Sequence, residues 1–283
     1  MASIKQKEYN WILNLMRCQK AMLHKSEAQL LELYQFCDND EQRDLLYELI
    51  TRFNCFEPDI YNAAIQDAVR FICGLGYKEE ETALVAFCHD IEADSSQVVL
   101  DDMKVPMALG GYCHIKTINR FDKILHEYNK SGQSIKHFIA VDEFVGSGKT
   151  LASRIEEFKS KGLQGVTIDF VFLAGMHDAI ELGKNLGASM FVVYEMEKGL
   201  TGFYCGDQLN LKCSIMKVLE CKLSSRINKT DLDEYHFGYH GAEALYCRPD
   251  KNVPNNVFPV FWWKEDMNGC PRRTILVRVQ DGY

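Results

Sequence analysis

Between residues 84 and 194, short apolar runs rich in β-branched and aromatic residues alternate with segments of helical pattern. The apolar runs are residues 84–87, 137–141, 166–173 and 190–194. The helical segments between them are residues 118–128, 150–161 and 177–186. Repeated strand–helix–strand order with continuously apolar strands is typical of a mostly parallel twisted sheet that helices cover on both faces. The sequence therefore predicts an α/β fold.

A purely helical pattern precedes these alternating segments. From about residue 9 to residue 77, apolar residues recur at three- and four-residue spacing, as in Leu45, Leu46, Leu49 and Ile50. Gly74 and Gly76 end this pattern. We expect residues 1–78 to form a helical subdomain, either a hood over a site or a docking surface, and residues 79–283 to form the α/β domain.

Composition and charge limit the partners of this chain. Of its 283 residues, 47% are hydrophobic and 25% are charged, as in an ordinary globular protein with a substantial core. The net charge of −8 gives no broad attraction for nucleic acid or an anionic membrane, so direct nucleic-acid binding is not indicated. No apolar run approaches the roughly 20 residues of a membrane span, and no membrane association is expected.

The cysteines do not suggest a disulfide framework. There are eleven, an odd number in a long chain, and no apolar leader follows the first residue. Reduced thiols in the cytoplasm are the expected state. A zinc site from Cys205, Cys213, Cys221, His236 and His240 is the alternative to buried thiols that act as small apolar residues, but the chain has no CxxC pair.

The most informative motif follows the apolar run 137–141. It consists of Asp142, Glu143, Phe144, Val145, Gly146, Ser147, Gly148, Lys149 and Thr150. Gly146 and Gly148 allow tight or left-handed backbone and close approach to an anion. Ser147 and Thr150 add hydroxyl donors, and the start of the next helix adds partial positive charge. The loop is therefore predicted to bind a phosphate group.

The two carboxylates before the loop restrict which phosphate compound fits. Asp142 and Glu143 would repel a polyphosphate unless ribose hydroxyls or a bound Mg²⁺ lay between them. The rival interpretation is a P-loop, since Gly148, Lys149 and Thr150 end the pattern GxxxxGK[ST], but that pattern needs glycine where the chain has Glu143. A ribose with a 5′-phosphate suits both the phosphate-binding loop and the two carboxylates before it. Lys149 is either a further phosphate contact or a solvated first-turn lysine.

The motif resembles the phosphoribosyl-diphosphate motif of type I phosphoribosyltransferases. By this resemblance, Asp142 and Glu143 match the acidic pair that holds the ribose hydroxyls, acts in catalysis and contacts Mg²⁺ indirectly. Phe144 and Val145 match the two apolar residues that follow the pair, and residues 146–150 match the cradle of the 5′-phosphate. The resemblance implies the type I phosphoribosyltransferase fold, with Mg²⁺ as cofactor.

A second resemblance involves the C-terminal part of the chain. Residues 238–246 contain a Gly-Tyr-x-Gly segment, and residues 252–262 contain a Pro-Asn-Asn turn before Trp262. These two segments resemble those of phosphoribosyltransferase-like proteins of bacterial conflict systems, the PRTase-CE group. That group commonly has threonine at positions 253 and 257, where this chain has valine. The resemblance implies an antiphage role beside operon-encoded partner proteins, and the Pro254–Asn256 turn is either functional or a local backbone cap.

Type I transferases also need a loop for the pyrophosphate, normally after the first core strand. The candidate here is residues 90–96, in which Asp94, Ser95 and Ser96 follow the apolar run 84–87. The serines would either donate to phosphate or cap the following helix. The loop has no Arg, Lys or Gly-Gly, and its carboxylates suit a pyrophosphate only if Mg²⁺ intervenes.

Two functions remain open on this basis. One is an enzyme that transfers or hydrolyses at the anomeric carbon of a ribose 5-phosphate donor, a reaction that depends on positioning and charge stabilisation. The other is a sensor that binds a nucleotide or phosphoribosyl compound without chemistry and signals to partners. His89, His114 and His177 lie near predicted strand ends where a catalytic base would act, although a lone histidine is more often structural.

Overall fold

The computed structural model describes residues 5–89, 94–249 and 251–279. It divides into two compact units. Residues 58–196 form one of them, which we call the sheet unit. Residues 1–57 and 197–283 form the other, which we call the split unit because two separate stretches of chain build it. The two units are described separately below.

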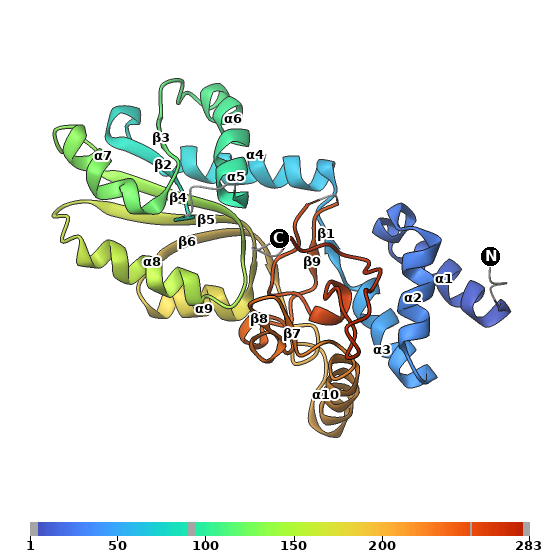
Figure 1. Ribbon diagram of the computed structural model, residues 1–283. Coiled ribbons are helices and arrows are strands. Elements are labelled where there is room, and N and C mark those ends of the chain that lie inside the picture. Colours follow the sequence, from blue (N-terminus) through green and yellow to red (C-terminus); the bar gives the residue numbers. More distant parts are fainter. Residues whose placement is uncertain (1–4, 90–93, 250, 280–283) are drawn as a thin grey trace. The chain divides into compact units, whose positions relative to one another are not determined.

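A five-stranded sheet forms the centre of the sheet unit (Figure 1). All of its pairings are parallel, and the strand order is β3-β2-β4-β5-β6. The strands are β2 (Thr82–Ala86), β3 (Lys116–Ile118), β4 (His137–Val145), β5 (Thr167–Met176) and β6 (Ser189–Met196). The predicted α/β class with a mostly parallel sheet is confirmed.

Helices cover both faces of this sheet. They are α4 (Pro58–Gly74), α5 (Ser95–Asp102), α6 (Lys104–Leu109), α7 (Ile124–Lys130), α8 (Lys149–Ser160) and α9 (His177–Asn185), with short 3₁₀ turns at Glu79–Glu81 and Phe121–Lys123. Figure 1 shows α4, α5 and α6 on one face and α8 and α9 on the other. Between the layers, Phe138, Phe170 and Phe172 are fully buried, because a sheet covered on both faces has no solvent-facing side.

The split unit combines N-terminal helices with a mostly irregular C-terminal segment. Its elements are α1 (Gln6–Cys18), a 3₁₀ turn (Lys20–His24), α2 (Glu27–Phe36), α3 (Asp40–Thr51), β1 (Asn54–Cys55), α10 (Gly206–Glu220), β7 (Arg226–Ile227), β8 (Thr230–Asp231), β9 (Tyr246–Cys247) and 3₁₀ turns at Leu232–Glu234, Tyr239–Gly241 and Pro259–Phe261. Ser26 and Asn39 cap α2 and α3 through their side-chain oxygens. Trp262 and Trp263 are buried in its core. Among the described residues, no helix has the length and apolarity to cross a bilayer.

A two-strand parallel pair joins the two stretches of the split unit. Strand β1 pairs with β9, so residues 54 and 55 lie beside residues 246 and 247. Phe56 also stacks edge-on against Tyr246 with ring centroids 5.0 Å apart. The N-terminal helices and the C-terminal segment thereby share one core.

Two details of the elements differ from the sequence predictions. Strand β4 continues to Val145 instead of ending at residue 141, because its ladder with β5 runs on through the pair Val145 and Gly175. Ile118 ends strand β3 and does not begin a helix. In the structure α4 packs with β5 and β6, while the C-terminal segment groups with α1–α3, and the predicted domains 1–78 and 79–283 stay a prediction.

Candidate functional site

The strand order places a topological switch point between β2 and β4. From β2 the chain proceeds to β3 on one side, and from β4 it proceeds to β5 and β6 on the other. At such a point the loops that leave the two strands diverge to opposite faces and open a crevice at the carboxyl edge of the sheet, where ligands of parallel α/β proteins bind. The β2–α5 loop and the β4–α8 loop border this crevice. The predicted site residues lie in these loops, in the end of β4 and in the first turns of α5 and α8.

A hydrogen bond joins the start of α5 to β4. Ser95, the first residue of α5, donates its hydroxyl to Oδ1 of Asp142 at 2.8 Å. The same carboxylate oxygen accepts the backbone N–H of Glu143 at 2.7 Å. The structure therefore brings together one residue of the predicted pyrophosphate loop and one of the predicted acidic pair.

The two members of the acidic pair do not share one surface of the sheet. Both lie inside β4, and successive side chains of a strand leave toward opposite faces. Asp142 is half-buried beside α5, whereas Glu143 is buried. Asp142 is thus the carboxylate that lies beside the start of α5.

Burial raises the pKa of Asp142 to about 8, and the carboxylate of Asp94 raises it further in the same direction. The bonds from Ser95 and from the backbone of Glu143 oppose this shift. A raised carboxyl pKa marks a position where the ionised carboxylate is unfavourable in the ligand-free protein. A cation bound there would stabilise the ionised form.

The turn from β4 to α8 is short and needs glycine. Only residues 146–148 lie between the end of β4 and the first residue of α8. Gly148 has φ of +78°, and a Cβ there would come within 2.9 Å of Leu182 Cδ2 and 3.2 Å of Ala179 Cα. Glycine is therefore required both by the left-handed backbone and by the close packing on α9.

This turn leaves the start of α8 suited to an anion. Gly148 occupies the N-cap position without a side chain to cap the helix, and the first turn of α8 contains no acidic residue. The first N–H groups of a helix have no intrahelical acceptor and carry partial positive charge. Ser147 is half-buried and Thr150 is exposed beside them, while Lys149 is exposed as the first helical residue. A single phosphate group fits this cradle better than a polyphosphate, because so short a turn cannot surround one.

The start of α5 has a different local arrangement. Asp94 is its N-cap, and its Oδ1 accepts the backbone N–H of Ser96 at 2.9 Å and the hydroxyl of Ser96 at 2.8 Å. Ser96 is fully buried and accepts the backbone N–H of Cys88 at 3.1 Å. These two residues therefore fix the loop that follows β2, and the predicted pyrophosphate role of residues 94–96 stays a prediction. Asp90 and Glu92, the other carboxylates of that loop, lie outside the described residues.

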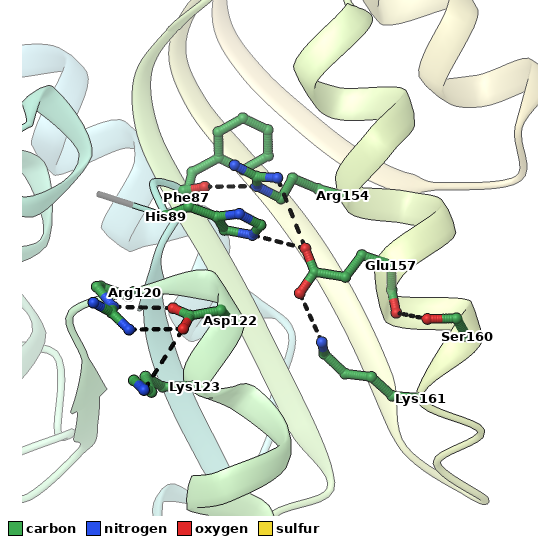
Figure 2. A network of polar contacts seen from close by, with 9 residues as sticks. All are labelled: Phe87, His89, Arg120, Asp122, Lys123, Arg154, Glu157, Ser160 and Lys161. Atoms are coloured by element: carbon green, nitrogen blue, oxygen red, sulfur yellow. Dashed lines mark hydrogen bonds and ion pairs between the residues drawn. The ribbon is translucent and has the colours of Figure 1, made fainter. Parts of the chain in front are cut away.

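A polar network anchors the end of β2 to α8 (Figure 2). Arg154 donates from Nε to the carbonyl of Phe87 at 3.2 Å, and His89 Nε2 lies 2.7 Å from a carboxylate oxygen of Glu157. Burial acts to raise the pKa of Glu157, but Lys161 and His89 lower it overall, so the carboxylate is held ionised. His89 is therefore a positioning residue for the β2 loop.

A second histidine and carboxylate lie at the same edge of the sheet. His177, the first residue of α9, contacts Glu195 of β6 through Nδ1. Val145, Gly175 and Glu195 are register partners across β4, β5 and β6, so this pair lies beside the turn that contains Gly148. Both side chains are about half exposed. The sequence pattern indicated His177 alone, and Glu195 is found beside it only through the order of the strands.

The donor set at the switch point suits Mg²⁺. Mg²⁺ prefers oxygen ligands and usually keeps several waters, bound by one or two carboxylates together with substrate oxygens. Asp142 and Asp94, whose charges act on each other, supply such carboxylates. Within the part of the chain that the structure describes, no three metal-binding side chains gather. Residues 205, 213, 221, 236 and 240 therefore form no zinc cluster there, and His236 instead contacts the buried carboxylate of Glu220 at 2.8 Å.

The fold and this edge of the sheet define a class: a parallel α/β protein with a glycine-containing turn into a helix and acidic residues at its switch point. The sequence model of the PRTase-CE family matches residues 11–278, and the chain belongs to that family. The predicted phosphoribosyltransferase-like class is thereby confirmed, and family and fold indicate a function related to phosphoribosyl transfer.

The comparison with curated proteins gives no match. Among solved structures, orotate phosphoribosyltransferase from Aeropyrum pernix is 17% identical over 48% of this chain and 70% of its own, with a TM-score of 0.33. A hypothetical protein from Neisseria gonorrhoeae with bound ppGpp is 11% identical over 51% and 85%, with a TM-score of 0.35. At TM-scores of this size, the two likenesses say nothing about the site.

Proposed function

We propose that this protein binds a ribose 5-phosphate donor such as phosphoribosyl diphosphate, together with Mg²⁺, and transfers the phosphoribosyl group or hydrolyses the donor at its anomeric carbon. The observation that carries the proposal is the bond from Ser95 to Asp142, which joins the start of α5 to β4, the strand that leads into the Gly148 turn. In this assignment the turn and the start of α8 hold the 5′-phosphate. Asp142 holds the ribose hydroxyls, and Glu143, which is buried on the other face of β4, supports the strand behind it.

Charge supports the same assignment. The ionised form of Asp142 is disfavoured in the ligand-free protein, so a ligand that brings Mg²⁺ and hydroxyl donors gains from neutralising it. During the reaction the bond from the anomeric carbon to the leaving pyrophosphate breaks, and positive charge develops on the ribose. A carboxylate close to the ribose ring stabilises that charge. Mg²⁺ would neutralise the pyrophosphate oxygens and would be held by Asp142 and Asp94.

We assign the acceptor side of the reaction to His177 and Glu195. A histidine oriented by a carboxylate takes a proton from a water molecule or an acceptor nitrogen as the new bond to the anomeric carbon forms. Replacing His177 with Gln should then abolish release of pyrophosphate while leaving donor binding intact. Loss of binding together with turnover would assign this residue to the binding site instead.

Binding is tested by thermal unfolding with Mg²⁺ and phosphoribosyl diphosphate, ribose 5-phosphate or ATP. A ligand at about 100 times its dissociation constant adds roughly 2.7 kcal/mol, which raises the midpoint by several degrees. The shift should occur with the ribose donor and vanish in Asp142→Asn/Glu143→Gln. The matched control is Asp44→Asn/Glu41→Gln, which alters two exposed carboxyl groups of α3. A shift with ATP alone would contradict the proposal.

A sensor without chemistry is the second candidate function. It is favoured by the β2–α5 loop, where Asp94 and Ser96 bond to each other and to the backbone, so that few donors are left for a leaving pyrophosphate. The two candidates differ in turnover. If donor binding persists but neither water nor any nucleobase supports Mg²⁺-dependent loss of the donor, the sensor function replaces the enzyme.

The biological setting that we propose is the bacterial cytoplasm, where the protein acts with operon-encoded partners in defence against phage. Family membership supports this part of the proposal. Expression of the protein with its neighbouring genes should lower the plating efficiency of phage. Asp142→Asn/Glu143→Gln should restore plating, and unchanged protection by that variant would separate the defence role from the ribose site.

A further inference from the structure

Two buried cysteines face each other across the strand pair of the split unit. Cys55 is the last residue of β1 and Cys247 the last residue of β9, and they are register partners in the parallel pairing. Their Sγ atoms lie 3.0 Å apart, and the residues are 9% and 4% exposed. The two thiols are 192 positions apart in the chain, so the fold alone brings them together.

The surroundings hold the two sulfurs in this position. The N–H of Asn54 bonds to the carbonyl of Leu245, and the N–H of Phe56 bonds to the carbonyl of Cys247, both at 2.8 Å. Neighbouring strands lie about 4.8 Å apart, within the range of about 4.4–6.8 Å between Cα atoms that a disulfide spans. A bond between the sulfurs therefore requires little backbone movement.

We propose that Cys55 and Cys247 form a reversible disulfide when the protein meets a peroxide. One thiolate attacks hydrogen peroxide, which gives a sulfenic acid and hydroxide. The second thiol then displaces water from the sulfenic sulfur. In total, two thiols and one hydrogen peroxide give one disulfide and two waters, and the peroxide takes up both electrons.

Burial makes this a slow reaction in the native protein. The neighbouring Cys247 thiol and burial raise the pKa of Cys55, which keeps its thiolate scarce. Peroxide reaches the sulfurs only when the two-residue ladder opens. A small oxidant is therefore favoured over a bulky disulfide such as oxidised glutathione.

The bond would close a covalent loop that contains the whole sheet unit. Residues 58–196 all lie between Cys55 and Cys247 in the chain. The crosslink itself joins the two stretches of the split unit, which are otherwise held together by packing, by the β1–β9 ladder and by polar contacts such as the ion pair of Lys222 with Asp38. The oxidised protein should therefore unfold at a higher temperature than the reduced one.

The test uses the full-length protein and two alkylating reagents of different mass. The first reagent blocks accessible thiols under native conditions, and the structure exposes those of Cys18, Cys113, Cys205, Cys221 and Cys270. Hydrogen peroxide is then added. Its dose is one that oxidises dithiothreitol present at the same concentration as the protein. The protein is then denatured and treated with the second reagent, and its peptides are mapped by mass spectrometry before and after reduction.

The expected result is that Cys55 and Cys247 carry neither label and appear in one linked peptide until the sample is reduced. Cys37 is the internal control because it is also buried, and its thiol should take the second label. Cys55→Ser should leave Cys247 open to the second label, and Cys37→Ala should leave the linked peptide unchanged.

The proposal is overturned if Cys55 and Cys247 of the peroxide-treated wild type take the second label, or if either is linked to another cysteine. This outcome can be read from the wild type alone, so a variant that fails to fold does not obstruct the test. No catalytic activity is required, and the result is independent of the proposed function.

Discussion

Asp142 is the residue of the switch point whose raised pKa links the stability of the protein to pH. Its pKa of about 8 means that the folded protein keeps a proton on this carboxyl that the unfolded chain releases near pH 4. Between these two values the folded state loses stability as the pH rises, and above about pH 8 the loss is complete. The contribution of Asp142 should therefore make the ligand-free protein more stable at pH 5 than at pH 9.

The Asp142→Asn variant tests this linkage. Asparagine cannot ionise, so the variant should gain on the order of 2 kcal/mol in unfolding free energy relative to the wild type between pH 5 and pH 9. Denaturant unfolding at both pH values measures the difference, and Asp44→Asn, on the exposed face of α3, serves as the control. If the pH dependence of the unfolding free energy changes alike in the two variants, the assignment of a raised pKa to Asp142 is wrong.

Gly148 offers a second test at the residue scale, because Gly162 is a matched control. Both glycines have positive φ, +78° and +62°, but a Cβ at Gly162 would meet nothing within 4 Å. Gly162→Ala should cost about 1–2 kcal/mol for the left-handed backbone alone. Gly148→Ala should cost about 1–3 kcal/mol more, since its Cβ overpacks against Leu182 and Ala179, and the phosphate cradle should be lost with it. Equal losses would show that α9 does not restrict this turn.

Among the elements, helix α5 depends on neighbouring serines with different roles. Ser96 is buried and bonds to Asp94 and to the backbone of Cys88, whereas Ser95 is exposed and bonds to Asp142. Ser96→Ala should destabilise the protein by about 1–3 kcal/mol, because a buried N–H loses its acceptor. Ser95→Ala should change stability little and should raise the pKa of Asp142 further, since the lost bond had lowered it.

Unfolding curves and a pH titration of the two serine variants measure both effects. Thermal midpoints should fall for Ser96→Ala only. The pH dependence of unfolding should shift for Ser95→Ala only. The opposite pattern would mean that Ser95, and not Ser96, holds the helix in place.

Element prediction from the sequence succeeded where the pattern was local. The three- and four-residue spacing of Leu45, Leu46, Leu49 and Ile50 correctly indicated helix α3. The end of β4 was missed because Asp142 and Glu143 are polar, and only the ladder with β5 shows that the strand continues through them. Ile118 was assigned to a helix because three residues of strand are too few to establish a period of two.

The site residues likewise fall into those that a local pattern predicts and those that depend on the order of the strands. The glycines and hydroxyls of residues 146–150 predict a phosphate-binding turn by their type and spacing alone. The bond from Ser95 to Asp142 and the contact of His177 with Glu195 depend on which strands are neighbours, and that order is not written in any local pattern.

At the scale of the whole molecule, long-range pairing should set the order of folding. The sheet unit is one continuous stretch, whereas β1 and β9 close a loop of 192 positions. Closing a long loop costs entropy before any contact compensates for it, so such pairings form late. Within refolding protein, amides of β4 should be protected before those of Asn54 and Phe56.

Pulsed hydrogen exchange during refolding measures this order. The N–H groups of Asn54 and Phe56 are suitable probes because they bond to the carbonyls of Leu245 and Cys247. The amide of Val141 in the buried centre of β4 represents the sheet unit. Earlier protection of Asn54 than of Val141 would contradict the prediction.

The interrupted path of the chain through the split unit also bears on synthesis. A ribosome delivers residues 58–196 before residues 197–283, so the sheet unit with its switch-point loops is complete while more than half of the split unit is still missing. Domains fold as they emerge, N-terminal parts first. Helices α1–α3 are the exception, because they must wait with an uncovered apolar face until the C-terminal segment arrives. The first stretch to be made is then among the last to be finished, and the growing chain is most open to misassembly and chaperones there.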